Sequence, residues 1–226
     1  MRSRIQIAGV RSADDARYLS ELGVDAIGLT VGLPRGAPDD LPPEAAAAIA
    51  AALPPFVTPV LITYRSEASD VVPLLRLIGA HVVQLHGDAP GAEVEKMRAA
   101  VPGLRVIRRV TVAGPEALQA AQAVEDADAL ILDSYDPGTG RLGATGRTHD
   151  WSVSAAIVRA VSVPVILAGG LRPENVAAAI RTVRPWAVDV HTGVEDSEGR
   201  LDRTKARKFV EAVLSTIGSD SHSLEG

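Results

Sequence analysis

Two aspartates stand where an acid catalyst is expected, at or near the end of short apolar runs. Asp133 follows four apolar residues, Ala129 to Leu132, and Asp189 has the equivalent place in the run 187–190. A carboxylate among apolar neighbours loses hydration, which raises its pKa and suits it to general acid catalysis. The alternative for Asp133 is a structural cap on the following turn. We take Asp133 as the candidate acid and Asp189 as a candidate substrate-binding residue.

Glycines that follow two of the apolar runs predict an anion site. Gly169 and Gly170 come after the run 163–167, and Thr192 and Gly193 come after the run 187–190. Glycine lets backbone N–H groups approach an anion closely, and short helix N-termini add partial positive charge. The paired glycines alone are equally consistent with a tight turn. The matching glycine after the second run favours a phosphate-binding site.

One arginine and two histidines complete the candidate site. Arg35 lies in a Pro-Arg-Gly segment and is suited to a bidentate pair with a substrate carboxylate, or else is a solvated surface residue. His86 is a candidate substrate-binding or acid–base residue, with hydrogen bonding inside its own loop as the alternative. His191 is the more exposed candidate for catalysis, beside Thr192 and Gly193. No group of residues has the spacing of metal ligands, so no metal is expected.

The elements that must position these residues form a regular series. Eight short β-branched runs recur at nearly even spacing, each followed by a segment of helical length. Alternation of strands and helices calls for a parallel sheet, and eight units in one chain of domain size favour closure. We predict an α/β fold, a single (β/α)8 TIM barrel over residues 1–217, with a flexible tail at 218–226. The predicted strands are 4–8, 26–29, 58–63, 81–85, 105–110, 129–133, 163–167 and 187–190.

Composition narrows the classes of protein to consider. The chain has 226 residues and a formal charge of −5, which gives no reason to expect nucleic acid or an anionic membrane as partner. No apolar run approaches the roughly 20 residues that cross a bilayer. The absence of cysteine excludes disulfides, thiolate metal sites and thiol nucleophiles, and is consistent with a cytoplasmic location.

Taken in order, these residues resemble phosphoribosylanthranilate isomerases of tryptophan biosynthesis. The strings Gln84-Leu85-His86-Gly87-Asp88 and Ala-Gly-Gly-Leu-x-Pro-Glu-Asn-Val at 168–176 are the most specific. The other matching segments are 7–10, 34–35, 132–134, 143–146 with 150–151, and 188–190 with 193–195.

The resemblance implies an Amadori rearrangement of a small phosphorylated substrate, by a cytoplasmic monomer or homodimer that needs no metal or organic cofactor. An acid protonates the ribose ring oxygen, the ring opens to a Schiff base, and a base removes the C2′ proton. By position, Asp133 is the family's acid, Arg35 its ligand for the anthranilate carboxylate, and the loops of Gly170 and Gly193 its phosphate clamp.

The chain departs from the family where the base is expected. The family pattern Lys-Ile-Cys-Gly, with cysteine as base, is Gln6-Ile7-Ala8-Gly9 in this chain. Ala8 has no titratable atom, and positioned acid–base groups contribute roughly 10²–10⁴-fold to a rate. Further differences from the family expected at the same end of the barrel are Ala144, His149, His191 and Thr192.

Three hypotheses follow. The first is an isomerase of the same reaction class whose base has moved, with His191 as first candidate and Asp133 shuttling both protons as second. The next is a paralogous enzyme acting on a different phosphorylated substrate. The third, which retention of Asp133, Asp189 and Arg35 makes least favoured, is a barrel that binds a phosphate ester without catalysis.

Overall fold

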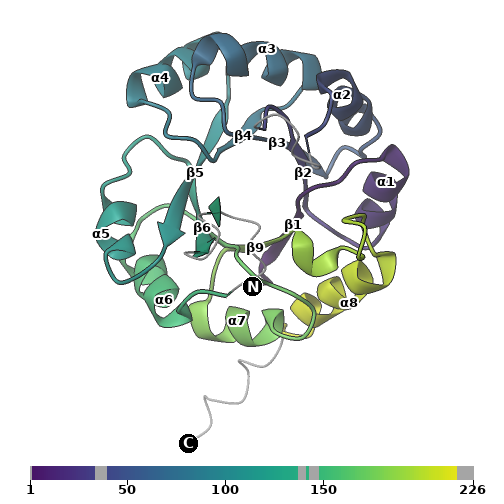
Figure 1. Cartoon of the computed structure of the whole chain (residues 1–226), viewed down its shortest axis with the longest axis vertical. Coiled ribbons are helices and arrows are strands. Elements are labelled where there is room, and N and C mark those ends of the chain that lie inside the picture. Colours follow the sequence, from purple (N-terminus) through teal and green to yellow (C-terminus); the bar gives the residue numbers. More distant parts are fainter. Residues whose placement is uncertain (1, 34–39, 137–140, 143–147, 218–226) are drawn as a thin grey trace, which may run out of the picture.

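Eight parallel strands close into a ring in the computed structural model, which describes residues 2–33, 40–136, 141–142 and 148–217. Each strand pairs with the next along the chain, and the last pairs with the first, in register Gln6 to Asp189. Figure 1 shows the ring viewed nearly along its axis. The predicted (β/α)8 barrel is therefore confirmed. The barrel strands are β1 Arg4–Ile7, β2 Ala26–Thr30, β3 Thr58–Thr63, β4 Val82–Leu85, β5 Arg105–Val112, β6 Ala129–Asp136, β8 Val165–Leu167 and β9 Ala187–Val190.

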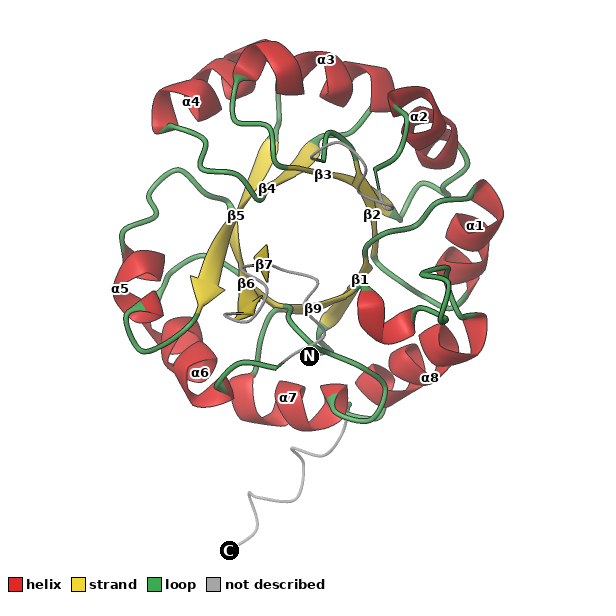
Figure 2. Ribbon diagram, viewed as in Figure 1, coloured by secondary structure: helices red, strands yellow, loops and turns green. Residues whose placement is uncertain are grey.

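Helices cover the outside of the ring (Figure 2). The first shows how the sequence sets a boundary, because the Ser12 side chain accepts from the backbone N–H of Asp15 and caps the helix. Leu22 ends that helix, and Gly23 follows with a φ of 86°. The helices are α1 Ala13–Glu21, α2 Pro43–Ala51, α3 Ala68–Ile78, α4 Gly91–Ala100, α5 Ala117–Gln122, α6 Trp151–Ala160, α7 Val176–Val183 and α8 Arg203–Leu214, with a short 3-10 helix η1 at Thr192–Val194.

One strand differs from its prediction in a way that affects the site. β6 continues past Asp133 to Asp136, where it pairs with a short antiparallel strand, β7 Arg141–Leu142. Asp133 therefore lies within a strand rather than at its last residue. Its backbone is held in register with Thr111 of β5, which fixes the direction of its side chain.

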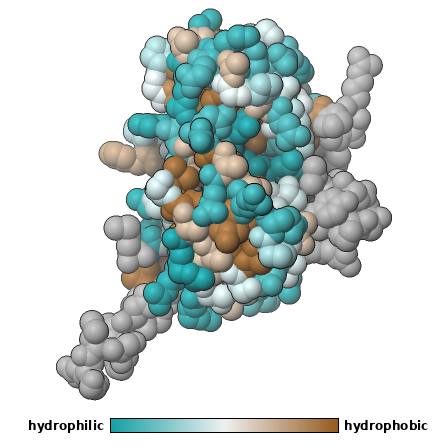
Figure 3. All heavy atoms as spheres, turned by 90° about the vertical axis from the view of Figure 1, so that its left-hand side faces the viewer, coloured by the Kyte–Doolittle hydropathy of each residue, from teal (hydrophilic) through white to brown (hydrophobic). Residues whose placement is uncertain are grey.

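The core has two layers. The larger lies between strands and helices, and a smaller cluster fills the inside of the ring. The inner cluster consists of Ala8, Val60, Ile62, Ile107, Ala129, Ile131, Ile166, Ala168 and Ala187. The outer surface beside α4 to α6 is largely hydrophilic, with apolar residues between (Figure 3). The expected tail, 218–226, lies outside the described residues.

Candidate active site

The two aspartates lie at the same level inside the barrel. Leu132 is in register with Leu167, and Leu167 with Val188, so Asp133 and Asp189 flank Ala168. Both are buried. Burial raises the pKa of Asp133 to about 6, although the backbone N–H of Ser134 stabilises its ionised form at 2.8 Å. Burial raises the pKa of Asp189 to about 7, helped by the nearby Asp133 charge. Two carboxyl groups able to hold protons near neutral pH therefore lie on either side of β8 in the barrel.

A buried chain of hydrogen bonds runs from Asp189 across the barrel. Gln6 Nε2 donates to Asp189 Oδ1 at 3.0 Å and to Gln84 Oε1 at 2.9 Å. Gln84 Nε2 then donates to His86 Nε2 at 2.7 Å. Because His86 Nε2 accepts, the imidazole proton is on Nδ1. Burial, and secondarily the charge of Arg109, lowers the pKa of His86 to about 3, so this histidine is neutral.

His191 lies near Ala8, the position at which the family resemblance predicts a cysteine. A Cβ atom on Gly9 would lie 2.1 Å from Nε2 of His191. The imidazole therefore packs directly on Gly9, the residue after Ala8, and leaves no room for a side chain there. Nε2 also lies 3.1 Å from Oε1 of Glu195. The side chains of His191 and Glu195 are 17% and 15% exposed, so this pair is largely shielded from water. A carboxylate at this distance stabilises the protonated form of an imidazole, which suits His191 to act as a general base.

Three of the four predicted phosphate residues line a cavity between the loops after β8 and β9. Gly170, Thr192 and Gly193 border a cavity of about 380 Å³ together with Lys205 of α8 and Arg172. Among the described residues, none accepts a hydrogen bond from the backbone N–H of Gly170 or Gly193. These donors and cations are what an anion requires.

Two glycines are required by local geometry. Gly170 has a φ of 63°, in the left-handed region, and the Asn175 side chain holds its carbonyl oxygen through Nδ2 at 2.9 Å. A Cβ on Gly193 would lie 1.9 Å from the carbonyl oxygen of Leu171, so no side chain fits there. The loops after β8 and β9 thus touch at the cavity. Gly169 packs against Ser134 instead of lining it.

Not every sequence candidate joins this site. Arg35 and Ala144 lie outside the described residues. His149 is placed beside α6, where its Nε2 lies 2.7 Å from Oγ of Ser154 and the side chain borders a separate cavity with Ser134. Burial lowers the pKa of His149 to about 4.

Three residues were missed by sequence reasoning. Glu195 contacts His191, which lies four residues earlier in the chain. This short separation of a histidine and a carboxylate is visible in the sequence. Lys205 reaches the phosphate cavity from a distant helix, and Arg109 faces the barrel interior from a strand that contains two consecutive arginines. Sequence alone gives no signal for these two.

The described part of the chain lacks two features. No group of three or more His, Cys, Asp and Glu side chains in that part is arranged to hold a metal ion. None of its helices is both long and apolar enough to span a membrane.

Comparisons with known proteins agree with the geometry. A family model described as N-(5′-phosphoribosyl)anthranilate isomerase matches residues 5–212. N-(5′-phosphoribosyl)anthranilate isomerase 2 of Methanosarcina mazei is 40% identical over 208 residues, which are 92% of each chain.

Solved structures give the same result. A phosphoribosylanthranilate isomerase in complex with reduced 1-(o-carboxyphenylamino)-1-deoxyribulose 5-phosphate has a TM-score of 0.80 and 29% identity, and covers 94% of this chain and 99% of its own. Monomers generated from the dimeric isomerase of Thermotoga maritima also have a TM-score of 0.80, with 27% identity and coverage of 94% and 99%.

Proposed function

The chain belongs to the phosphoribosylanthranilate isomerase family, and on this premise we propose that it isomerises phosphoribosylanthranilate in tryptophan biosynthesis with a histidine in place of the cysteine base. The observation that carries this proposal is the His191 imidazole, which lies over Gly9 beside Ala8 and against Glu195. The imidazole therefore lies close to Ala8, the position that holds the cysteine base in the family.

Asp133 supplies the proton that opens the ring. Its pKa of about 6 leaves part of the population protonated near neutral pH. Protonation of the ring oxygen breaks its bond to C1′, and the amine lone pair forms the C1′=N bond of the Schiff base. His191 then takes the C2′ proton, the C–H electrons form the C1′=C2′ bond, and the C=N pair returns to nitrogen. Protonation at C1′ and loss of the hydroxyl proton at C2′ give the ketone, with no external oxidant.

The remaining candidates bind the substrate. We place the phosphate in the cavity of Gly170, Thr192 and Gly193, supported by Lys205, with Gly169 shaping the loop. Asp189 faces the sugar from one end of the hydrogen-bonded chain, and His86 contacts the substrate from the other end. Arg35 is the ligand that the family resemblance offers for the anthranilate carboxylate.

The experiment is turnover of freshly prepared phosphoribosylanthranilate by the purified chain, followed as the appearance of the C2′ ketone carbon by NMR. We expect conversion by the native chain and none by Asp133→Ala. Binding of the substrate without conversion would favour the non-catalytic barrel. Stabilisation by another phosphate ester, with no response to anthranilate derivatives, would favour the paralogous enzyme.

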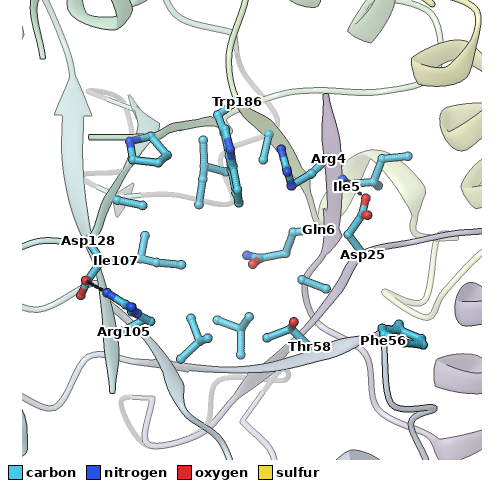
Figure 4. Close-up of a pocket in the computed structure, with 17 residues that line it drawn as sticks. Arg4, Ile5, Gln6, Asp25, Phe56, Thr58, Arg105, Ile107, Asp128 and Trp186 are labelled. Carbon is cyan, nitrogen blue, oxygen red and sulfur yellow. Dashed lines mark hydrogen bonds and ion pairs between the residues drawn. The ribbon is translucent and has the colours of Figure 1, made fainter. Parts of the chain in front are cut away.

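We also propose a homodimer, formed through the amino end of the barrel. A cavity of about 500 Å³ opens there because the inner residues, such as Ala26, Ala129 and Ala187, are small. Phe56 stands at its rim, 98% exposed, and Trp186 borders the cavity on another side (Figure 4). An exposed aromatic ring beside an apolar hollow suits insertion into a second copy, and the Thermotoga maritima relative is dimeric.

Sedimentation of the native chain and of Phe56→Ser tests this assembly. We expect a dimer for the native chain and a monomer for the variant, with Leu77→Ser, an exposed residue on α3, as the matched control. A native monomer, or a variant that stays dimeric, would contradict it. We propose a cytoplasmic location, in keeping with a biosynthetic family.

A further inference from the structure

Arg109 faces the inside of the barrel. Successive side chains of a strand point to opposite faces. The directions of the two preceding residues of β5 therefore fix the direction of Arg109. Ile107 belongs to the inner cluster, whereas Arg108 points outward and donates to the carbonyl oxygen of Ala89 at 2.8 Å. Arg109 therefore shares the inner face with Ile107, one layer closer to the mouth.

His86 is the neighbour of Arg109 on the adjacent strand. Leu85 is in register with Arg108, so His86 and Arg109 occupy the next rung of β4 and β5. The charge of Arg109 lowers the pKa of both His86 and Asp133, which places the guanidinium near the two side chains. Arg109 thus lies at the mouth rather than toward the amino end.

Both residues carry a buried nitrogen that lacks a partner. Neither Nδ1 of His86 nor Nη1 of Arg109 has a hydrogen-bond partner among the described residues. The hydrogen-bonded chain from Asp189 puts the His86 proton on Nδ1, so this atom is a donor. No described carboxylate forms an ion pair with Arg109 either. A buried donor or cation left unpaired destabilises the fold, and such groups in native proteins call for a partner.

The two donors lie across the mouth from the phosphate cavity. In the ring order, β4 is opposite β9 and β5 is opposite β1, as Figure 2 shows. The phosphate cavity is bordered by the loops after β8 and β9. A substrate anchored there by its phosphate and lying across the mouth brings its other end to His86 and Arg109.

We propose that Arg109 and His86 together bind the carboxylate of the substrate's aryl amine and so determine specificity for a carboxylated substrate. This inference rests on the proposed isomerase function. A guanidinium and an N–H donor side by side match the two oxygens of a carboxylate through charge-assisted hydrogen bonds. The pair adds to the contact that the family resemblance implies for Arg35, which lies outside the described residues.

The test compares two reduced product analogues, 1-(o-carboxyphenylamino)-1-deoxyribitol 5-phosphate and the anilino compound without the carboxyl group, by calorimetry. We expect Arg109→Met to weaken the carboxylated ligand about 10–100-fold, the range for loss of a charge-assisted hydrogen bond. The affinity for the anilino compound should stay nearly unchanged. Arg108→Met, the outward neighbour, is the matched control and should preserve the preference.

A second readout separates binding from structure. Arg109→Met removes a cation whose buried Nη1 has no partner among the described residues, so the ligand-free variant should unfold at a higher temperature than the native chain. Arg109→Lys keeps the positive charge but cannot form the two parallel hydrogen bonds of a guanidinium, so it should lose only part of the preference for the carboxylated ligand. This variant keeps the test available if the methionine variant misfolds. Equal weakening of both ligands, or no weakening of either, would overturn this inference while turnover by the native chain still supported the isomerase. Failure of the native chain to bind either analogue would overturn both.

Discussion

The imidazole of His191 and the carboxylate of Glu195 lie 3.1 Å apart, from Nε2 to Oε1. The two residues stand at the start of η1 and directly after its end, and this short helix fixes their separation. Oε1 of Glu195 also lies 3.8 Å from Nη2 of Arg11. The negative charge of the carboxylate therefore stabilises the imidazolium that forms when His191 accepts a proton.

Replacement of Glu195 by glutamine should weaken the base without removing it. The amide no longer stabilises the imidazolium, so kcat should fall about tenfold, which corresponds to about 1.4 kcal/mol. Glu198→Gln, an exposed carboxylate three residues further along the chain, is the control. A kcat of Glu195→Gln equal to the native value would show that Glu195 does not act on the base.

Asp133→Asn should remove the acid and keep the binding site. The pKa of Asp133 is about 6, so the protonated form needed for ring opening decreases as pH rises above that value. The native kcat/KM should therefore fall on the alkaline side of pH 6. The variant should lose roughly 10²–10⁴-fold in kcat with little change in ligand affinity. Asp70→Asn, an exposed carboxylate on α3, should behave as the native chain does.

The sequence predicts the barrel better than it predicts the site. Apolar runs and local caps such as Ser12 are encoded within a few residues, so strands and helices could be placed from the sequence. The extension of β6 depends on pairing with Arg141–Leu142, a contact between separate segments. Which of Arg108 and Arg109 faces inward depends on strand register, and the approach of Lys205 to Gly193 depends on how α8 packs. These relationships arise only in the folded chain.

Lys205→Met should weaken phosphate binding and spare the chemistry. Lys205 borders the cavity of Gly170 and Gly193, and its Nζ donates to the carbonyl oxygen of Glu195 at 2.6 Å. We expect KM to rise by about tenfold, or about 1.4 kcal/mol, with kcat nearly unchanged, and inorganic phosphate to become a weaker competitor. Lys208→Met on the same helix is the matched control. An unchanged KM would exclude Lys205 from the phosphate site.

Asp189→Asn should reduce the dependence of stability on pH. Burial raises the folded-state pKa of Asp189 from 3.8 to about 7. Its contribution to the free energy of unfolding is therefore fully present below pH 4, where the carboxyl is protonated in both states, and is lost as pH rises through 7. The shift corresponds to about 4 kcal/mol across this window. Urea unfolding between pH 5 and 8 should show a smaller loss of stability for the variant than for the native chain. Equal slopes would mean that Asp189 ionises as easily in the folded state as in the unfolded state.

The central claim, that His191 replaces the missing cysteine, is tested most directly by the turnover of His191→Ala. We predict a loss of roughly 10²–10⁴-fold in kcat, with substrate affinity retained, and partial recovery when Ala8→Cys is added to that variant. His81→Ala, an exposed histidine, should leave kcat unchanged. Turnover by His191→Ala close to that of the native chain would contradict the account.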